Sequence, residues 1–111
     1  MTAIPEPVAR SDVDAAGLDG WVWRDGDVPA IVGGFVASDY TAAASFALEV
    51  AVAADRAVHH PDIDLRYPRH ARVTLTTHGL GGVSHLDLAL AAEINALAAD
   101  AGVGHESTTP R

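Results

Sequence analysis

Histidine is the residue type in this chain whose number and spacing point to chemistry. Four of the six histidines fall close together along the chain, namely His59, His60, His70 and His78. An imidazole titrates near neutral pH, so two of them in opposite protonation states can donate and accept protons on an organic substrate. Three imidazoles can also hold a zinc ion, and histidines occur at surfaces and interfaces without any chemistry. The residues alone leave these three interpretations open.

The metal interpretation has the least support in the spacing. The chain contains no HxH or HxxxH pattern, which would place two imidazoles on one face of an element. Asp62 and Asp64 follow the first two histidines, but directly after Pro61 such carboxylates are typically solvated. We therefore predict no metal site.

The elements that position the histidines follow from the apolar pattern. Residues 40–58 contain no Gly or Pro, and apolar side chains recur there every three or four positions. This pattern predicts a long helix that ends just before His59, and Pro61 prevents its continuation. The alternation of residues 72–77 predicts a half-buried strand that ends just before His78. Functional residues are often found at such ends of elements.

The other segments complete an α+β domain. We expect a weak helix at 13–18, strands near 22–24, 30–37 and 63–66, and a last helix from a Ser84 cap to about Asp100. The order helix, strand, strand, helix, strand, strand, helix predicts a four-stranded antiparallel sheet with the helices packed on one face. The other face is then open to solvent or to a partner. Gly33 and Gly34 in the second strand predict a bulge or a close approach by another group.

Composition excludes several classes of protein. The 111 residues suffice for one domain, and the absence of cysteine removes disulfides, thiolate nucleophiles and iron–sulfur clusters. A net charge of −8 with scattered arginines argues against nucleic-acid binding. No apolar run approaches the ~20 residues that cross a bilayer, and the N-terminal residues lack the pattern of a secretory signal. We therefore expect a cytoplasmic protein that binds neither nucleic acid nor membranes.

The ends of the chain differ in composition from its middle. Residues 1–12 and 101–111 are rich in proline and polar residues. This composition predicts a flexible N-terminal arm and a flexible C-terminal tail on either side of a domain at 13–100.

A motif in several parts around the histidines resembles one family. Its parts are Asp55, His59-His60-Pro61, Tyr67, Thr77-His78 and Asp87. Upstream and downstream, the same register includes Gly20-Trp21, Phe35, Asp39-Tyr40, Phe46, Gly81-Gly82-Val83 and Leu90-Ala91. This pattern resembles the signature of the pterin-4a-carbinolamine dehydratases, from Gly20 to the end of the last helix.

The resemblance implies an α+β homodimer or homotetramer that removes water from 4a-hydroxytetrahydropterin. The product is quinonoid dihydropterin, formed in tetrahydropterin recycling without a metal or an organic cofactor. By position in the motif, His59 and His78 would be the principal acid–base residues, and His60 would hold and polarise the pterin.

The remaining motif residues would bind or orient the substrate or the histidines. By the same resemblance, these are Asp55, Pro61, Thr77 and Asp87. Between Tyr67 and His78 the chain has one residue more than the family pattern, which predicts a one-residue bulge within 68–71 that could turn His78 away from the pocket.

A second hypothesis belongs to another class. On the same fold, the resemblance includes a dimerisation cofactor for a homeodomain transcription factor and an assembly factor for a carbon-fixing enzyme. The alternative is therefore a non-catalytic binding or scaffold protein with an unknown protein partner. The retained histidines favour the enzyme, because a scaffold has no need of them.

Overall fold

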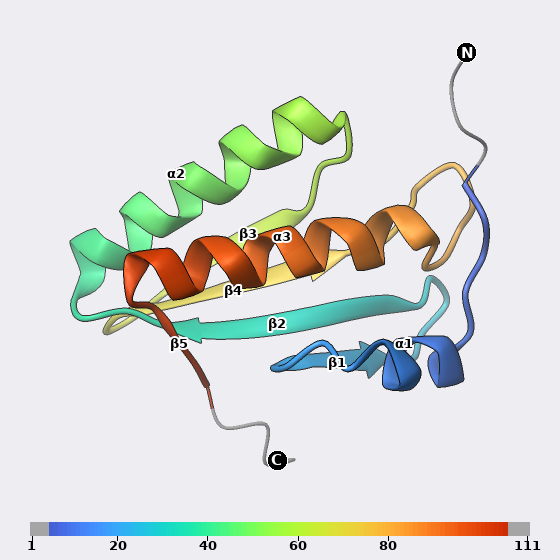
Figure 1. Ribbon diagram of the computed structural model, residues 1–111, viewed down its shortest axis with the longest axis horizontal. Helices are drawn as coiled ribbons and strands as arrows, with labels where there is room; N and C mark the ends of the chain where they lie inside the picture. The colour runs from blue at the N-terminus through green and yellow to red at the C-terminus, as the bar shows by residue number, and fades with distance from the viewer. Residues whose placement is uncertain (1–4, 107–111) are drawn as a thin grey trace.

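The chain folds into an antiparallel sheet with two long helices on one face (Figure 1). The computed structural model describes residues 5–106. In chain order the elements are α1 (Arg10–Ala16), β1 (Trp21–Arg24), β2 (Ala30–Val36), α2 (Tyr40–Ala57), β3 (Asp62–Arg66), β4 (His70–Leu75), α3 (His85–Ala101) and β5 (Gly104–His105). The predicted α+β class and the element order are confirmed. The number of strands differs, because β5 is an additional short strand.

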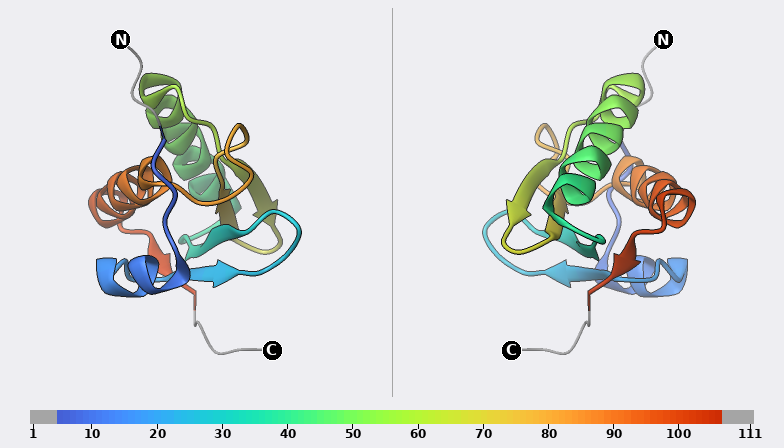
Figure 2. Two further views of the ribbon diagram at one scale, coloured as in Figure 1. Left: turned by 90° about the vertical axis from the view of Figure 1, so that its right-hand side faces the viewer. Right: turned by 90° about the vertical axis from the view of Figure 1, so that its left-hand side faces the viewer.

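The sheet order is β1-β2-β4-β3, and every pair is antiparallel. Side chains on β2 alternate between the two faces, so Ile31 and Phe35 are fully buried beneath the helices. Phe35 packs against Phe46 of α2, with the ring centroids 4.9 Å apart. Figure 2 shows α1 beside β1, at the opposite end of the molecule from α2.

Both long helices begin and end where the sequence predicts, within about two residues. The Asp39 side chain accepts a hydrogen bond from the Ala42 amide at 2.8 Å and caps α2. Ser84 caps α3 and forms a capping box with Asp87. None of the helices in residues 5–106 combines the length and the hydrophobicity that a membrane span requires.

The predicted bulge within 68–71 is absent. Strands β3 and β4 pair residue by residue from Arg66↔His70 to Asp62↔Thr74, and β4 pairs with β2 in the same regular way. Residues 67–69 form the hairpin turn between the two strands, outside the paired residues. β4 also ends earlier than expected, because the Thr77 amide donates to the Gly82 carbonyl at 2.8 Å and thereby closes a separate turn.

The two glycines of β2 confirm one of the alternatives predicted for them, the close approach. Both pair regularly with β4, so no bulge forms there. A Cβ atom on Gly33 would lie 2.8 Å from the Trp21 indole, and one on Gly34 would lie 2.5 Å from the Glu106 carboxylate. Trp21 therefore covers one face of β2 and Glu106 the other.

The segment before α1 pairs with the start of α3. The Val8 amide donates to the Val83 carbonyl, and the His85 amide donates to the Glu6 carbonyl, both at 3.0 Å. α1 begins at Arg10, three residues before the expected start. The expected arm and tail at 1–12 and 101–111 thus include paired backbone, whereas residues 1–4 and 107–111 lie outside the described residues.

Candidate active site

His59 is positioned by the way in which α2 ends. The His59 amide donates to the Ala54 carbonyl at 3.1 Å, and the Val58 amide donates to Asp55 at 3.2 Å. These two bonds form a Schellman motif, in which the residue at the position of Val58 adopts the left-handed conformation. Val58 has φ 51° and ψ 43°, where glycine is the usual residue. A β-branched residue there is strained, and this strain directly precedes His59.

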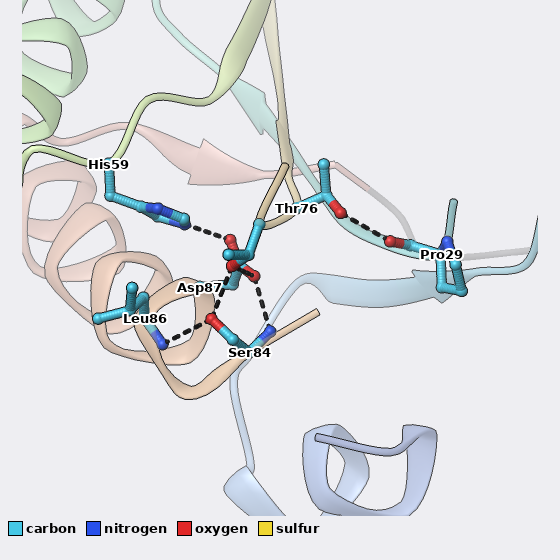
Figure 3. A network of polar contacts seen from close by, with 7 residues as sticks. Pro29, His59, Thr76, Ser84, Leu86 and Asp87 are labelled. Carbon is cyan, nitrogen blue, oxygen red and sulfur yellow. Dashed lines mark hydrogen bonds and ion pairs between the residues drawn. The ribbon is translucent and has the colours of Figure 1, made fainter. Parts of the chain in front are cut away.

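Asp87 is the centre of a buried hydrogen-bond network next to His59 (Figure 3). Its carboxylate is fully buried and receives bonds from three sides. His59 Nε2 lies 2.5 Å from Oδ1, the Thr77 hydroxyl donates to Oδ2 at 2.8 Å, and the Ser84 amide donates to Oδ2 at 2.9 Å. Burial without such partners would cost several kcal/mol, so these bonds hold the carboxylate in place.

Residues that follow or begin three different elements meet at this network. His59 follows α2, Thr77 follows β4, and Asp87 lies in the first turn of α3. The side chain of His59 is 10% exposed, and its Nε2 faces the carboxylate. The arrangement can hold an imidazole in a fixed orientation, as a general base requires.

The other predicted site residues lie outside this network. His60 Nε2 lies 2.9 Å from an Asp55 carboxylate oxygen, and both side chains are mostly exposed. Pro61 leads from this pair into β3. His78 is exposed in the turn after Thr77, and among residues 5–106 its side chain forms no hydrogen bond or ion pair.

The structure therefore brings together three of the seven predicted site residues, namely His59, Thr77 and Asp87. Ser84 is a fourth member, and its place in the sequence predicted only a helix cap. Its hydroxyl lies 2.6 Å from the Thr77 hydroxyl, and its side chain is fully buried. The capping-box spacing from Ser84 to Asp87 was the available signal, because it already places a serine hydroxyl beside the carboxylate.

A second pair of a histidine and a carboxylate lies on the face of the sheet opposite the helices. His70 Nδ1 lies 2.6 Å from a carboxylate oxygen of Glu106, next to β5. Because Ala71 faces the helices, His70 faces away from them. Within the described part of the chain, no three His, Asp or Glu side chains converge in a way that could hold a metal ion.

The fold and this network define a class of protein: an antiparallel sheet covered by two helices, with a buried histidine–aspartate pair where α2, β4 and α3 meet. A family model described as pterin 4 alpha carbinolamine dehydratase matches residues 6–97. The chain belongs to this family, as the motif around the histidines predicted.

Individual relatives agree with that assignment. A Chloroflexus aggregans protein named "Putative pterin-4-alpha-carbinolamine dehydratase" is 49% identical over 65 residues, which are 59% of this chain and 68% of that protein. One of the same name from Thermomicrobium roseum is 42% identical over 81 residues, covering 73% and 83% of the two chains.

Two solved structures share the fold. The transcriptional coactivator/pterin dehydratase from Brucella melitensis superposes with a TM-score of 0.73 at 34% identity, covering 82% of this chain and 97% of that one. A pterin dehydratase-like protein identified as a RuBisCO assembly factor in the α-carboxysome has a TM-score of 0.56 at 27% identity, covering 68% and 88%.

Proposed function

We propose that this protein dehydrates 4a-hydroxytetrahydropterin to quinonoid dihydropterin by histidine acid–base catalysis. The observation that carries the proposal is the buried His59–Asp87 pair, with 2.5 Å between Nε2 and Oδ1. A carboxylate that accepts a hydrogen bond from an imidazole fixes the orientation of the ring, so that its other nitrogen can exchange protons with a substrate. Family membership supplies the substrate class.

The reaction needs one acid and one base, and the proposal assigns a histidine to each. His78 donates a proton to the 4a-hydroxyl oxygen, the C–O bond breaks, and its electron pair leaves with water. His59 takes the proton from the ring N–H, and the electrons of that bond form the C=N double bond of the product. The protons gained and lost balance, so only the two histidines need to be reset by solvent.

The exposed residues have roles in binding. His60 holds and polarises the pterin, and Asp55 orients His60 through the 2.9 Å contact between them. Pro61 fixes the chain beyond the pair, because its ring restricts the backbone there. The reaction uses neither a metal nor an organic cofactor, and the enzyme works as a cytoplasmic homo-oligomer.

Stopped-flow measurement of 4a-hydroxytetrahydropterin decay tests the proposal. We expect the wild-type protein to accelerate the decay, and His59→Ala and His78→Ala to reduce turnover by ~10² or more, the usual contribution of a positioned acid or base. His70→Ala is the matched control, because His70 lies on the other face of the sheet and its variant should retain the wild-type rate. Equal rates for wild type and His59→Ala, with both folded, would contradict the assignment.

A second candidate function is an assembly or scaffold role. Its support is the similarity to the pterin dehydratase-like protein identified as a RuBisCO assembly factor. This function would require no turnover at all. A folded wild-type protein that leaves the decay of 4a-hydroxytetrahydropterin unchanged would favour this second candidate over the first.

A further inference from the structure

We propose that Ser84 and Thr77 form a hydroxyl chain that fixes Asp87 and thereby positions His59. The two hydroxyls are positioning groups, because they act on the reaction only through Asp87 and the imidazole. The inference deepens the proposed function and rests on the role of His59 as the base. Ser84 then has two roles: its side chain caps α3, and its hydroxyl helps to position Asp87.

The donor and acceptor of each hydrogen bond between these hydroxyls and the carboxylate follow from counting protons. Thr77 has one hydroxyl proton, and it donates that proton to Asp87 Oδ2 at 2.8 Å. The contact of 2.6 Å between the two hydroxyls therefore has Ser84 as its donor. The Ser84 oxygen in turn accepts from the Leu86 amide at 3.2 Å. All the donors therefore point the same way: the Leu86 amide donates to Ser84, the Ser84 hydroxyl to Thr77, and the Thr77 hydroxyl to Asp87.

This direction determines which nitrogen of His59 carries a proton. Asp87 Oδ2 accepts from both Thr77 and the Ser84 amide, so it acts only as an acceptor. An ionised carboxylate has no proton to donate, so in the 2.5 Å contact with Oδ1 His59 Nε2 is the donor. In the neutral ring, Nδ1 then keeps its lone pair and is the atom that accepts a proton.

Burial allows the two hydroxyls and the carboxylate to act as a rigid unit. Ser84 and Asp87 are fully buried and Thr77 is 6% exposed. The N-terminal segment holds Ser84 from both sides, since Val8 pairs with Val83 and Glu6 pairs with His85. With little water available, a hydroxyl that loses its partner cannot replace it, so removing one member loosens the carboxylate.

The test follows the Nε2 proton of His59 by ¹H NMR on ¹⁵N-histidine-labelled protein without substrate. A proton held by a fixed carboxylate exchanges slowly and gives a resolved downfield signal. We expect this signal in the wild type, and its loss through exchange in Ser84→Gly and in Thr77→Val. Thr77→Ser, which keeps the hydroxyl, should restore it. The same two variants that lose the signal should lower kcat by roughly 10- to 100-fold, the range seen for partners behind a metal-bound histidine.

A matched control separates positioning from helix capping. Glycine is tolerated at an N-cap nearly as well as serine, so Ser84→Gly removes the hydroxyl while largely keeping the cap. Asp39→Gly makes the equivalent change at the start of α2, away from His59, and should leave both the signal and kcat unaltered. Ser84→Gly serves as the second variant if Thr77→Val does not fold.

The outcomes distinguish this inference from the proposed function. Retention of the His59 signal in both Ser84→Gly and Thr77→Val would overturn the positioning role. A wild-type protein that shows the signal but does not turn over 4a-hydroxytetrahydropterin would overturn the proposed function alone, because the signal requires no catalysis.

Discussion

At the scale of single residues, the charge of Asp87 is the feature on which the site depends most. Asp87→Asn keeps the shape of the side chain but replaces one acceptor oxygen with an N–H donor. The new donor must face either His59 or the two donors from Thr77 and Ser84, and in both cases a buried polar group loses its partner. We expect a loss of about 1–3 kcal/mol in the free energy of unfolding and a fall in kcat of ~10² or more, as for a base without its orienting carboxylate.

Urea denaturation and the pterin assay measure these two effects. Asp55→Asn is the control for stability, because Asp55 is 78% exposed and an exposed pair contributes at most about 1 kcal/mol. A value for Asp87→Asn equal to that of Asp55→Asn would mean that burial does not raise the cost of losing the carboxylate.

The sequence predicted some residues of this site but not all, because only some of them belong to a pattern with fixed spacing. His59, Thr77 and Asp87 belong to a motif with fixed spacing, so the family resemblance indicated all three together. Ser84 lies outside the family motif, and only its capping-box spacing to Asp87 indicates that it belongs to the site. Its contact with Thr77 depends on the turn that the Thr77–Gly82 pairing closes. The geometry of this glycine-rich turn decides the contact between the hydroxyls, and the sequence pattern does not specify that geometry.

At the scale of elements, the two long helices end in the same motif but with different residues. In α3 the Val103 amide donates to Ala98 and the Gly102 amide to Ala99, which is the Schellman pattern with glycine at φ 70°. In α2 the equivalent position is Val58, with φ 51° and a side chain that is largely exposed. The C-terminal end of α2, next to His59, therefore contains backbone strain that the C-terminal end of α3 avoids.

Exchanging the residue types tests this difference. Left-handed backbone costs a residue with a Cβ roughly 1–2 kcal/mol, and the flexibility of glycine when unfolded offsets part of that. We expect Val58→Gly to raise the free energy of unfolding by about 0.5–1 kcal/mol, and Gly102→Ala to lower it by a similar amount. Urea denaturation of both variants against the wild type gives the two values. A destabilised Val58→Gly protein would show that Val58 makes stabilising contacts that outweigh its strain.

Elements were predictable where they carry their own local signals. Both long helices have a capping side chain and an apolar stripe, and their predicted limits agree with the structure. The pairing of residues 6–8 with 83–85 and the strand β5 were not predicted. Both are short backbone pairings in segments rich in polar residues, so neither periodicity nor propensity marks them.

At the scale of the whole molecule, the outer face of α2 exposes apolar side chains that residues 5–106 leave uncovered. Tyr40, Leu48 and Val52 are 50%, 65% and 42% exposed. Leu48 and Val52 are four positions apart and so are neighbours on the helix surface, and Tyr40 lies at the edge of the same broad face. The opposite side of α2 packs on the sheet through Phe46 and Val50. An apolar stripe of this kind on a small domain is typical of an interaction surface.

We expect this stripe to join copies of the chain in the proposed homo-oligomer. Leu48→Glu together with Val52→Glu would place two charges at the interface, so the mass measured by light scattering should fall to that of an 11.5 kDa monomer. Val28→Glu is the control, since Val28 is 47% exposed in the β1–β2 turn and lies away from α2. The urea midpoint of the double variant, measured at a concentration where both proteins are monomeric, should match the wild type, because both side chains are exposed. A wild-type monomer at micromolar concentration would contradict the oligomer, and a double variant that stays oligomeric would place the interface on another surface.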